Sequence, residues 1–180
     1  MKRPANHLMT TFLALSLAGP SVAQSSPAAE GAPWLAADSA ARTATITLEV
    51  TAPAGSPSAL INGYREGGVQ VVVPLRWTIT WNWISADSAG KHSLVLMAER
   101  EKLPLEGGRP AFTNAMTRSV TAGLPGGQAD ATTFEAEEAG WFWLLCGVPE
   151  HALAGEWIGV RVDPDASMPA IKVRTPPVSP

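Results

Sequence analysis

Cysteine is almost absent from this sequence, because Cys146 is the only one among 180 residues. A single cysteine cannot form an internal disulfide, so no such bridge holds the fold together. Histidine is also rare, and the chain contains only His7, His92 and His151. The cysteine is therefore either an inert buried thiol or a sulfur with another chemical use.

A hydrophobic run long enough to cross a membrane is missing as well. The chain begins instead with two basic residues, a short apolar stretch at 12–18 and the small residues Ser-Val-Ala at 21–23. This order is typical of a secretory signal peptide, and a membrane span would need roughly 20 apolar residues. No cysteine follows that could carry a lipoprotein anchor. We predict that residues 1–23 are removed after Ala23, and that the mature protein is soluble and exported, to the periplasm or the extracellular space.

Clusters of lysine and arginine are lacking too. The chain has 13 basic and 16 acidic residues, and removal of 1–23 takes away two basic residues and no acid, which leaves 11 against 16 and a net charge of −5. An acidic protein without a basic patch is a poor partner for nucleic acid or anionic lipid. We predict no nucleic-acid binding and no membrane insertion of the mature chain.

Long helical repeats are absent, and short strand patterns take their place. Apolar and polar residues alternate over 75–84, with the apolar positions at Leu75, Trp77, Ile79, Trp81 and Trp83. A period of two indicates a half-buried strand. Further strands are predicted at 43–50, 68–74, 92–97, 131–137, 140–146 and 156–162. A series of short strands without helices predicts a single all-β domain, an antiparallel β-sandwich or barrel.

The predicted domain covers residues 34–163. A flexible lead-in at 24–33 precedes it, and a Pro-rich C-terminal tail at 164–180 follows it. Within the domain, the stretch 98–127 contains several Gly and Pro residues and is too long for an ordinary connection. We predict a loop excursion there, with a short helical turn near 111–118.

The seven tryptophans could be read as a binding platform. Most of them, however, lie on the inward parity of predicted strands, where aromatic side chains fill a core. We therefore predict core packing for Trp77, Trp81 and Trp143, and leave Trp157 open because it lies beside the candidate site.

Without residues 1–23 the chain keeps one cysteine and two histidines. Cys146 ends one predicted strand, His151 follows five residues later across a turn, and His92 begins another strand. Strand ends at one rim of a sandwich can bring such side chains together. A thiolate with two imidazoles is the trigonal set of a blue-copper electron-transfer centre, which a weak axial ligand completes. The alternative is that each of the three packs as an ordinary structural residue.

The stretch CGVPEHALAGEW, residues 146–157, resembles the ligand loop of the sulfocyanin-type cupredoxins, a blue-copper protein family. In that family the loop reads Cys-Gly-Val-Pro-Gly-His, followed by small residues and Gly-Met-Trp. The resemblance continues through INGYREGGVQVVVPLRWTITWNW, KHSLVL, AFTNAMTRSVTAGLPGG and FEAEEAGWFW, and covers 34–163. It implies a cupredoxin-like Greek-key β-sandwich, one mononuclear copper and electron transfer. By position it implies that His92, Cys146 and His151 are copper ligands.

Two positions of the loop depart from the family pattern. Glu150 replaces the glycine before the second histidine, which we expect to affect only the surface, and Glu156 replaces the axial methionine. Glu156 either binds copper, turns into solvent and leaves an open position, or marks a site that has lost its metal. We favour the first, in which an oxygen ligand favours Cu(II), lowers the reduction potential and changes the colour. The remaining methionines lack the expected offset from the second histidine: Met97, Met116 and Met168.

The resulting prediction is an exported one-electron carrier, not an enzyme, that exchanges electrons with redox partner proteins of an exported electron-transfer chain. Its copper cycles between Cu(I) and Cu(II). Three alternatives stay open: a copper-handling module without routine redox cycling, a red-copper centre that reacts with a small molecule, and a sandwich with incidental Cys and His residues. A multicopper enzyme would need further histidine clusters, and a dinuclear centre would need a second cysteine.

Overall fold

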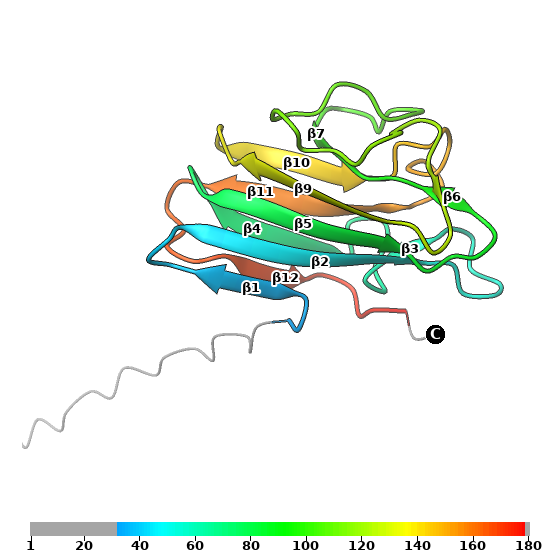
Figure 1. Cartoon of the computed structure of the whole chain (residues 1–180), viewed down its shortest axis with the longest axis horizontal. Helices are drawn as coiled ribbons and strands as arrows, with labels where there is room; N and C mark the ends of the chain where they lie inside the picture. The colour runs from blue at the N-terminus through cyan, green and yellow to red at the C-terminus, as the bar shows by residue number, and fades with distance from the viewer. Residues whose placement is uncertain (1–31, 179–180) are drawn as a thin grey trace, which may run out of the picture.

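The computed structural model describes residues 32–178. The predicted signal peptide at 1–23 and nearly all of the lead-in at 24–33 lie outside these residues. The described chain forms twelve strands and no helix (Figure 1). It therefore contains no helix that is long and apolar enough to cross a membrane. The prediction of an all-β domain is confirmed.

The first sheet is built around β2 and β5, which run parallel to each other. Its strands lie in the order β1 (Leu35–Asp38), β2 (Thr43–Thr51), β5 (Thr78–Ser85) and β9 (Ala129–Glu135), and β3 (Leu60–Ile61) pairs with the end of β2. Along β5 buried and more exposed residues alternate as the sequence pattern predicts. One face of this sheet therefore belongs to the core.

The second sheet packs against the first as the other layer of a sandwich (Figure 1). Its strands lie in the order β12 (Ala170–Val173), β4 (Val69–Pro74), β11 (Trp157–Asp163), β10 (Gly140–Leu145) and β7 (Val95–Ala98). The β4–β11 pair is parallel and the other pairs are antiparallel, so both sheets are mixed. A separate two-stranded ladder joins β6 (Lys91–His92) to β8 (Leu124–Pro125).

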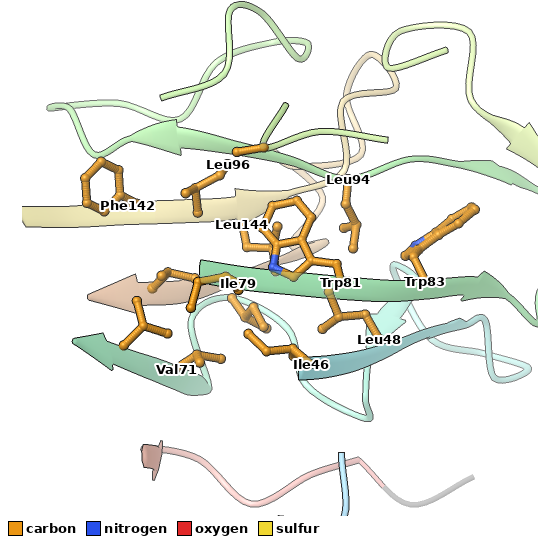
Figure 2. Packing of buried hydrophobic residues seen from close by; sticks show 14 of the residues in the cluster. Ile46, Leu48, Val71, Ile79, Trp81, Trp83, Leu94, Leu96, Phe142 and Leu144 are labelled. Carbon is orange, nitrogen blue, oxygen red and sulfur yellow. The ribbon is translucent and has the colours of Figure 1, made fainter. Parts of the chain in front are cut away.

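The core lies between the two sheets, where side chains from both layers point toward one another (Figure 2). Trp81 and Trp83 come from the first sheet, and Phe142 and Leu144 from the second. Burial of such large apolar side chains is the main force that holds the layers together. The predictions of core packing for Trp77, Trp81 and Trp143 are confirmed, because all three are buried.

A second, smaller cluster covers the outer face of β7 and β10. There Trp143 and Leu145 pack with Val95, and the long stretch 98–127 contributes Leu103 and Val120 to the same cluster. This explains why β10 is buried on both faces over most of its length. The loop excursion predicted for 98–127 therefore acts as a cover over the strand that leads into Cys146.

The predicted helical turn near 111–118 is wrong. This segment hydrogen-bonds along the stretch that contains β7: Ala111 N–H donates to the Leu96 carbonyl at 2.7 Å, and Thr117 N–H donates to the Leu94 carbonyl at 2.8 Å. The N–H groups of Ala111 and Thr117 thus bond to a neighbouring segment, and the Ala115 N–H closes a single turn on the Phe112 carbonyl without starting a helix. The local sequence gave no sign of this long-range pairing.

Two further segments differ from their predicted outlines. The strand predicted at 92–97 is interrupted at Ser93 and Leu94, so that β6 and β7 are separate strands. Part of the predicted tail at 164–180 also belongs to the sandwich, because β12 pairs antiparallel with β4. The β6–β7 break matters for function, since it lies beside His92 at the rim where β10 ends and β11 begins (Figure 1).

Candidate metal centre

The loop from Cys146 to Glu156 connects β10 to β11 and closes on itself. Cys146 N–H donates to the Glu156 carbonyl at 3.0 Å, and Glu156 N–H donates to the His151 carbonyl at 3.0 Å. The adjacent residues Leu145 and Trp157 are the last pair of the β10–β11 ladder. The ladder and the loop together hold Cys146, His151 and Glu156 at one rim of the sandwich.

His92 reaches the same rim from β6, which pairs with β8. It is 3% exposed, so its imidazole lies inside the protein. Glu156 is 1% exposed and Cys146 is fully buried. Only His151 reaches the surface, with 31% of its side chain exposed.

These four side chains converge. One ligand atom from each of His92, Cys146, His151 and Glu156 lies within 4.8 Å of the others. Nδ1 of His92 lies 2.9 Å and 3.0 Å from the two oxygens of Glu156. Nδ1 of His151 lies 3.0 Å from Oε2 of Glu156 and 3.5 Å from Sγ of Cys146. Both histidines thus present the same ring nitrogen to one point.

Glu156 faces the centre and not the solvent. Its burial and its contacts with both imidazoles place the carboxylate among the other donors. Among residues 32–178 the methionines lie elsewhere: Met97 packs against the cluster around Trp143, while Met116 and Met168 are exposed. Glu156 is therefore the fourth donor of this group.

Ser93 supports the thiol, and sequence reasoning missed it. Its N–H donates to Sγ of Cys146 at 3.5 Å. Its hydroxyl donates to the Val120 carbonyl at 2.6 Å and accepts the Gly147 N–H at 3.0 Å. The side chain thus joins three segments around the cysteine. The only signal in the sequence was its place directly after His92.

Asp87 was also missed. Its Oδ2 lies 2.9 Å from Nε2 of His92, the ring nitrogen on the side away from Glu156. Its other oxygen, Oδ1, accepts the Ala89 N–H at 2.9 Å. His92 therefore lies between two carboxylates, one at each ring nitrogen.

These contacts change the proton affinities of both histidines. Burial alone would lower the pKa of His92, but its interactions with Cys146, Glu156 and Asp87 outweigh burial and raise the pKa to about 11. Hydrogen bonds to Cys146 and Glu156 raise the pKa of His151 to about 9. The hydrogen bond with His92 lowers the pKa of Asp87. Without a metal, both imidazoles are therefore protonated at neutral pH.

The donor set suits copper. Thiolate sulfur stabilises Cu(I), and imidazole and carboxylate accept Cu(II). In the metal-free protein, protons on the two Nδ1 atoms lie between the imidazoles and Glu156. A metal ion that binds the Nδ1 lone pairs takes the place of these protons. The four side chains thus already surround the position that a cation would occupy.

A small hollow of about 140 Å³ opens beside the centre. His92, His151 and Glu156 line it, together with residues 57–59 and Ala154. The buried Oγ of Ser58 has no hydrogen-bond partner among residues 32–178. A cavity of this size has room for water or another small molecule.

Comparison with known proteins identifies a matching family. The model of the family described as Sulfocyanin (SoxE) domain matches residues 30–172. No curated protein matches the sequence.

Several solved structures have a fold similar to that of this chain. A crystal structure of rusticyanin variants is similar with a TM-score of 0.51 and 16% identity, over 68% of this chain and 78% of that chain. Reduced auracyanin from Roseiflexus castenholzii has a TM-score of 0.45 and 21% identity, over 66% of this chain and 97% of that chain. A copper-containing nitrite reductase from Thermus scotoductus has a TM-score of 0.48 and 17% identity, over 68% of this chain but 28% of that chain. The predicted cupredoxin-like sandwich is confirmed.

Proposed function

This chain belongs to the sulfocyanin family of cupredoxins, and from that premise we propose that it is an exported one-electron carrier with a single copper ion. In this proposal His92, Cys146 and His151 would hold the copper, and Glu156 would bind it in place of the family's methionine. The observation that carries the proposal is the convergence of these four donors within 4.8 Å of one another.

The residues hold the donor atoms in place before a metal arrives. Cys146 and Glu156 are joined through their backbone, and Ser93 ties the cysteine to the neighbouring loops. Bound copper would supply the one-electron step between Cu(I) and Cu(II). Donors that are fixed by the fold in both oxidation states keep the reorganisation on electron transfer small.

Glu156 sets the character of the centre in this proposal. Rotation of its carboxylate into solvent would expose a side chain that is 1% exposed and would break its contacts with both histidines. An oxygen donor in place of methionine sulfur stabilises Cu(II) over Cu(I). We therefore expect a lower reduction potential than a methionine ligand would give, and a colour shifted from blue toward green or red.

We expect electrons to enter and leave the centre through His151, because its ring is the one part of the centre with substantial exposure. We propose that redox partner proteins of an exported electron-transfer chain dock around it. Export itself rests on the signal-like residues 1–23, and places the mature protein in the periplasm or outside the cell.

The test is to express residues 24–180, load the protein with Cu(II), and record its absorption and EPR spectra. We expect a thiolate-to-Cu(II) charge-transfer band and the EPR signal of one copper. Cys146→Ser is the matched control, since it removes the sulfur and should lose the band. A correctly folded wild-type protein that gives no such band would refute the copper proposal. Reversible one-electron voltammetry then distinguishes a carrier from a copper-handling module.

The hollow beside the centre supports a second candidate, a red-copper centre that reacts with a small molecule. Its lining includes three copper-ligand candidates, His92, His151 and Glu156, and the buried hydroxyl of Ser58, which has no hydrogen-bond partner among residues 32–178. A rapid change of the copper spectrum on addition of nitric oxide would favour this candidate. An unchanged spectrum, with reversible voltammetry, would favour the carrier.

A further inference from the structure

We propose that Asp87 is a positioning residue that keeps a proton on Nε2 of His92, so that Nδ1 faces the metal, and whose negative charge stabilises the oxidised centre. The effect of Asp87 on the oxidised centre rests on the proposed function. The effect of Asp87 on the His92 imidazole does not, and it can be measured without copper.

The tautomer follows from the hydrogen-bonding capacity of the two groups. The Asp87 carboxylate can only accept, so the 2.9 Å contact with Nε2 requires that this nitrogen carries the proton. A neutral imidazole has one protonated nitrogen, and its other nitrogen has the free lone pair. In the metal-free protein Nδ1 also carries a proton, which it donates toward Glu156. When a metal ion displaces that proton, the bond to Asp87 retains the Nε2 proton, and the free lone pair is on Nδ1, which faces the other donors. A partner at the second ring nitrogen is how proteins commonly orient a metal-binding histidine.

The backbone of the loop between β5 and β6 leaves room for the hydrogen bond between Asp87 and His92. Oδ1 of Asp87 accepts the Ala89 N–H, which leaves Oδ2 for His92. A Cβ atom on Gly90 would overlap both Oδ2 of Asp87 and Nε2 of His92. Glycine at position 90 is therefore what lets the carboxylate and the imidazole meet. A Cβ atom on Gly126 would likewise overlap the Asp87 backbone.

The charge of Asp87 acts in a poorly solvated place. Its side chain is 12% exposed and that of His92 is 4% exposed. Two carboxylates, Asp87 and Glu156, thus contact the same imidazole from opposite sides. Negative charge that is screened little by solvent stabilises Cu(II) more than Cu(I). Asp87 therefore lowers the reduction potential in addition to any effect of Glu156.

Asparagine at position 87 is the most informative substitution. Asn has nearly the same shape, but it offers only one acceptor and carries no charge. It cannot accept from both Ala89 N–H and His92 Nε2–H with the present geometry. Asp87→Asn thus tests charge and proton placement without a large change of volume, and Asp87→Ala removes both contacts.

The first measurement uses the metal-free protein at neutral pH and needs no copper. In 15N–1H NMR spectra, we expect a slowly exchanging, downfield Nε2–H resonance of His92 in the wild type, and its loss in Asp87→Ala and Gly90→Ala. Ser88→Ala, in the same loop at an exposed position, is the matched control and should retain it. Equal protection of this proton in Asp87→Ala and the wild type would overturn the positioning role.

The second measurement uses the copper-loaded protein. We expect a higher reduction potential in Asp87→Asn, an unchanged one in the exposed distant control Asp165→Asn, and metal affinity about 10- to 100-fold weaker in Asp87→Ala. An equal potential in Asp87→Asn and the wild type would overturn the charge role. If the wild type itself gives no thiolate band, the copper proposal fails, and the NMR result still decides whether Asp87 positions His92.

Discussion

Oε1 of Glu156 lies 2.9 Å from Nδ1 of His92, although the two residues are 64 positions apart in the sequence. The same carboxylate reaches Nδ1 of His151 at 3.0 Å. Glu156 thereby joins the ligand loop to β6, and it does so inside the protein. A change at position 156 consequently acts on the centre and not on the surface.

The first prediction concerns this carboxylate. Glu156→Met replaces oxygen by thioether sulfur, which stabilises Cu(I), so the reduction potential should rise and the absorption should shift toward blue. Glu156→Gln is the matched control, because it keeps the size and one carbonyl oxygen but removes the charge. We expect its potential to lie between those of the wild type and Glu156→Met. Identical spectra of wild type and Glu156→Met would show that Glu156 does not bind the metal.

The second prediction is that metal binding releases protons. Both histidines are protonated in the metal-free protein at neutral pH, since their pKa values are raised to about 11 and about 9. Copper must displace the Nδ1 protons, so the apparent affinity should increase with pH up to about 9 and beyond. Calorimetric titrations in buffers of different ionisation enthalpy count the protons that are released. Release of none between pH 6 and 8 would contradict the protonation of both imidazoles.

The same shifts predict how the stability of the metal-free protein depends on pH. A raised histidine pKa means that the folded state binds the proton more tightly than the unfolded state, where the pKa is near 6.5. This stabilisation is complete below pH 6.5 and is lost as the pH rises through about 9 and about 11. Asp87 has a lowered pKa, so its contribution is present above 3.8 and is lost as the pH falls further. Urea unfolding of metal-free protein should therefore show lower stability at pH 10 than at pH 6.5, and His92→Gln should reduce this difference.

Much of the fold could be predicted because its signals are local. The alternation along β5 depends on neighbouring residues, and so does the turn that separates Cys146 from His151. The strand β12 escaped prediction because it is short, largely exposed and flanked by proline. The absence of a helix at 111–118 results from pairing with residues 94–96, which no local pattern reveals.

The candidate centre also contains some residues that could be predicted from the sequence and others that could not. The convergence of His92, Cys146 and His151 could be predicted because cysteine and histidine are so rare that few combinations exist. Asp87 and Ser93 could not, since aspartate and serine are common in loops and only their contacts with His92 and Cys146 distinguish them. For Glu156 the sequence favours an inward orientation among three possibilities, and its burial among residues from distant segments shows that orientation.

The fourth prediction concerns Ser93. Ser93→Ala leaves the buried Gly147 N–H without its acceptor and the Val120 carbonyl without its donor. An unpaired buried polar group costs roughly 1–3 kcal/mol, so the free energy of unfolding should fall by about that amount. Chemical denaturation of the metal-free protein measures it, with Ser88→Ala as the exposed control. No loss of stability would mean that water or another group replaces the hydroxyl.

The fifth prediction concerns Glu150, whose backbone has a φ of 70°. This left-handed conformation is strained for a residue with a Cβ atom and is natural for glycine. Glycine relieves strain of about 1–2 kcal/mol but loses more chain entropy on folding, so Glu150→Gly should stabilise the protein by about 1 kcal/mol or less. Glu150→Ala is the matched control, because it removes the same charge and keeps the strain, and it should give no gain. The backbone bonds of Glu150 to Leu105 and Ala154 do not involve its side chain, so the copper spectrum should stay the same in both variants. Equal stability of the glycine and alanine variants, measured by chemical denaturation, would show that the backbone at this position is not under strain.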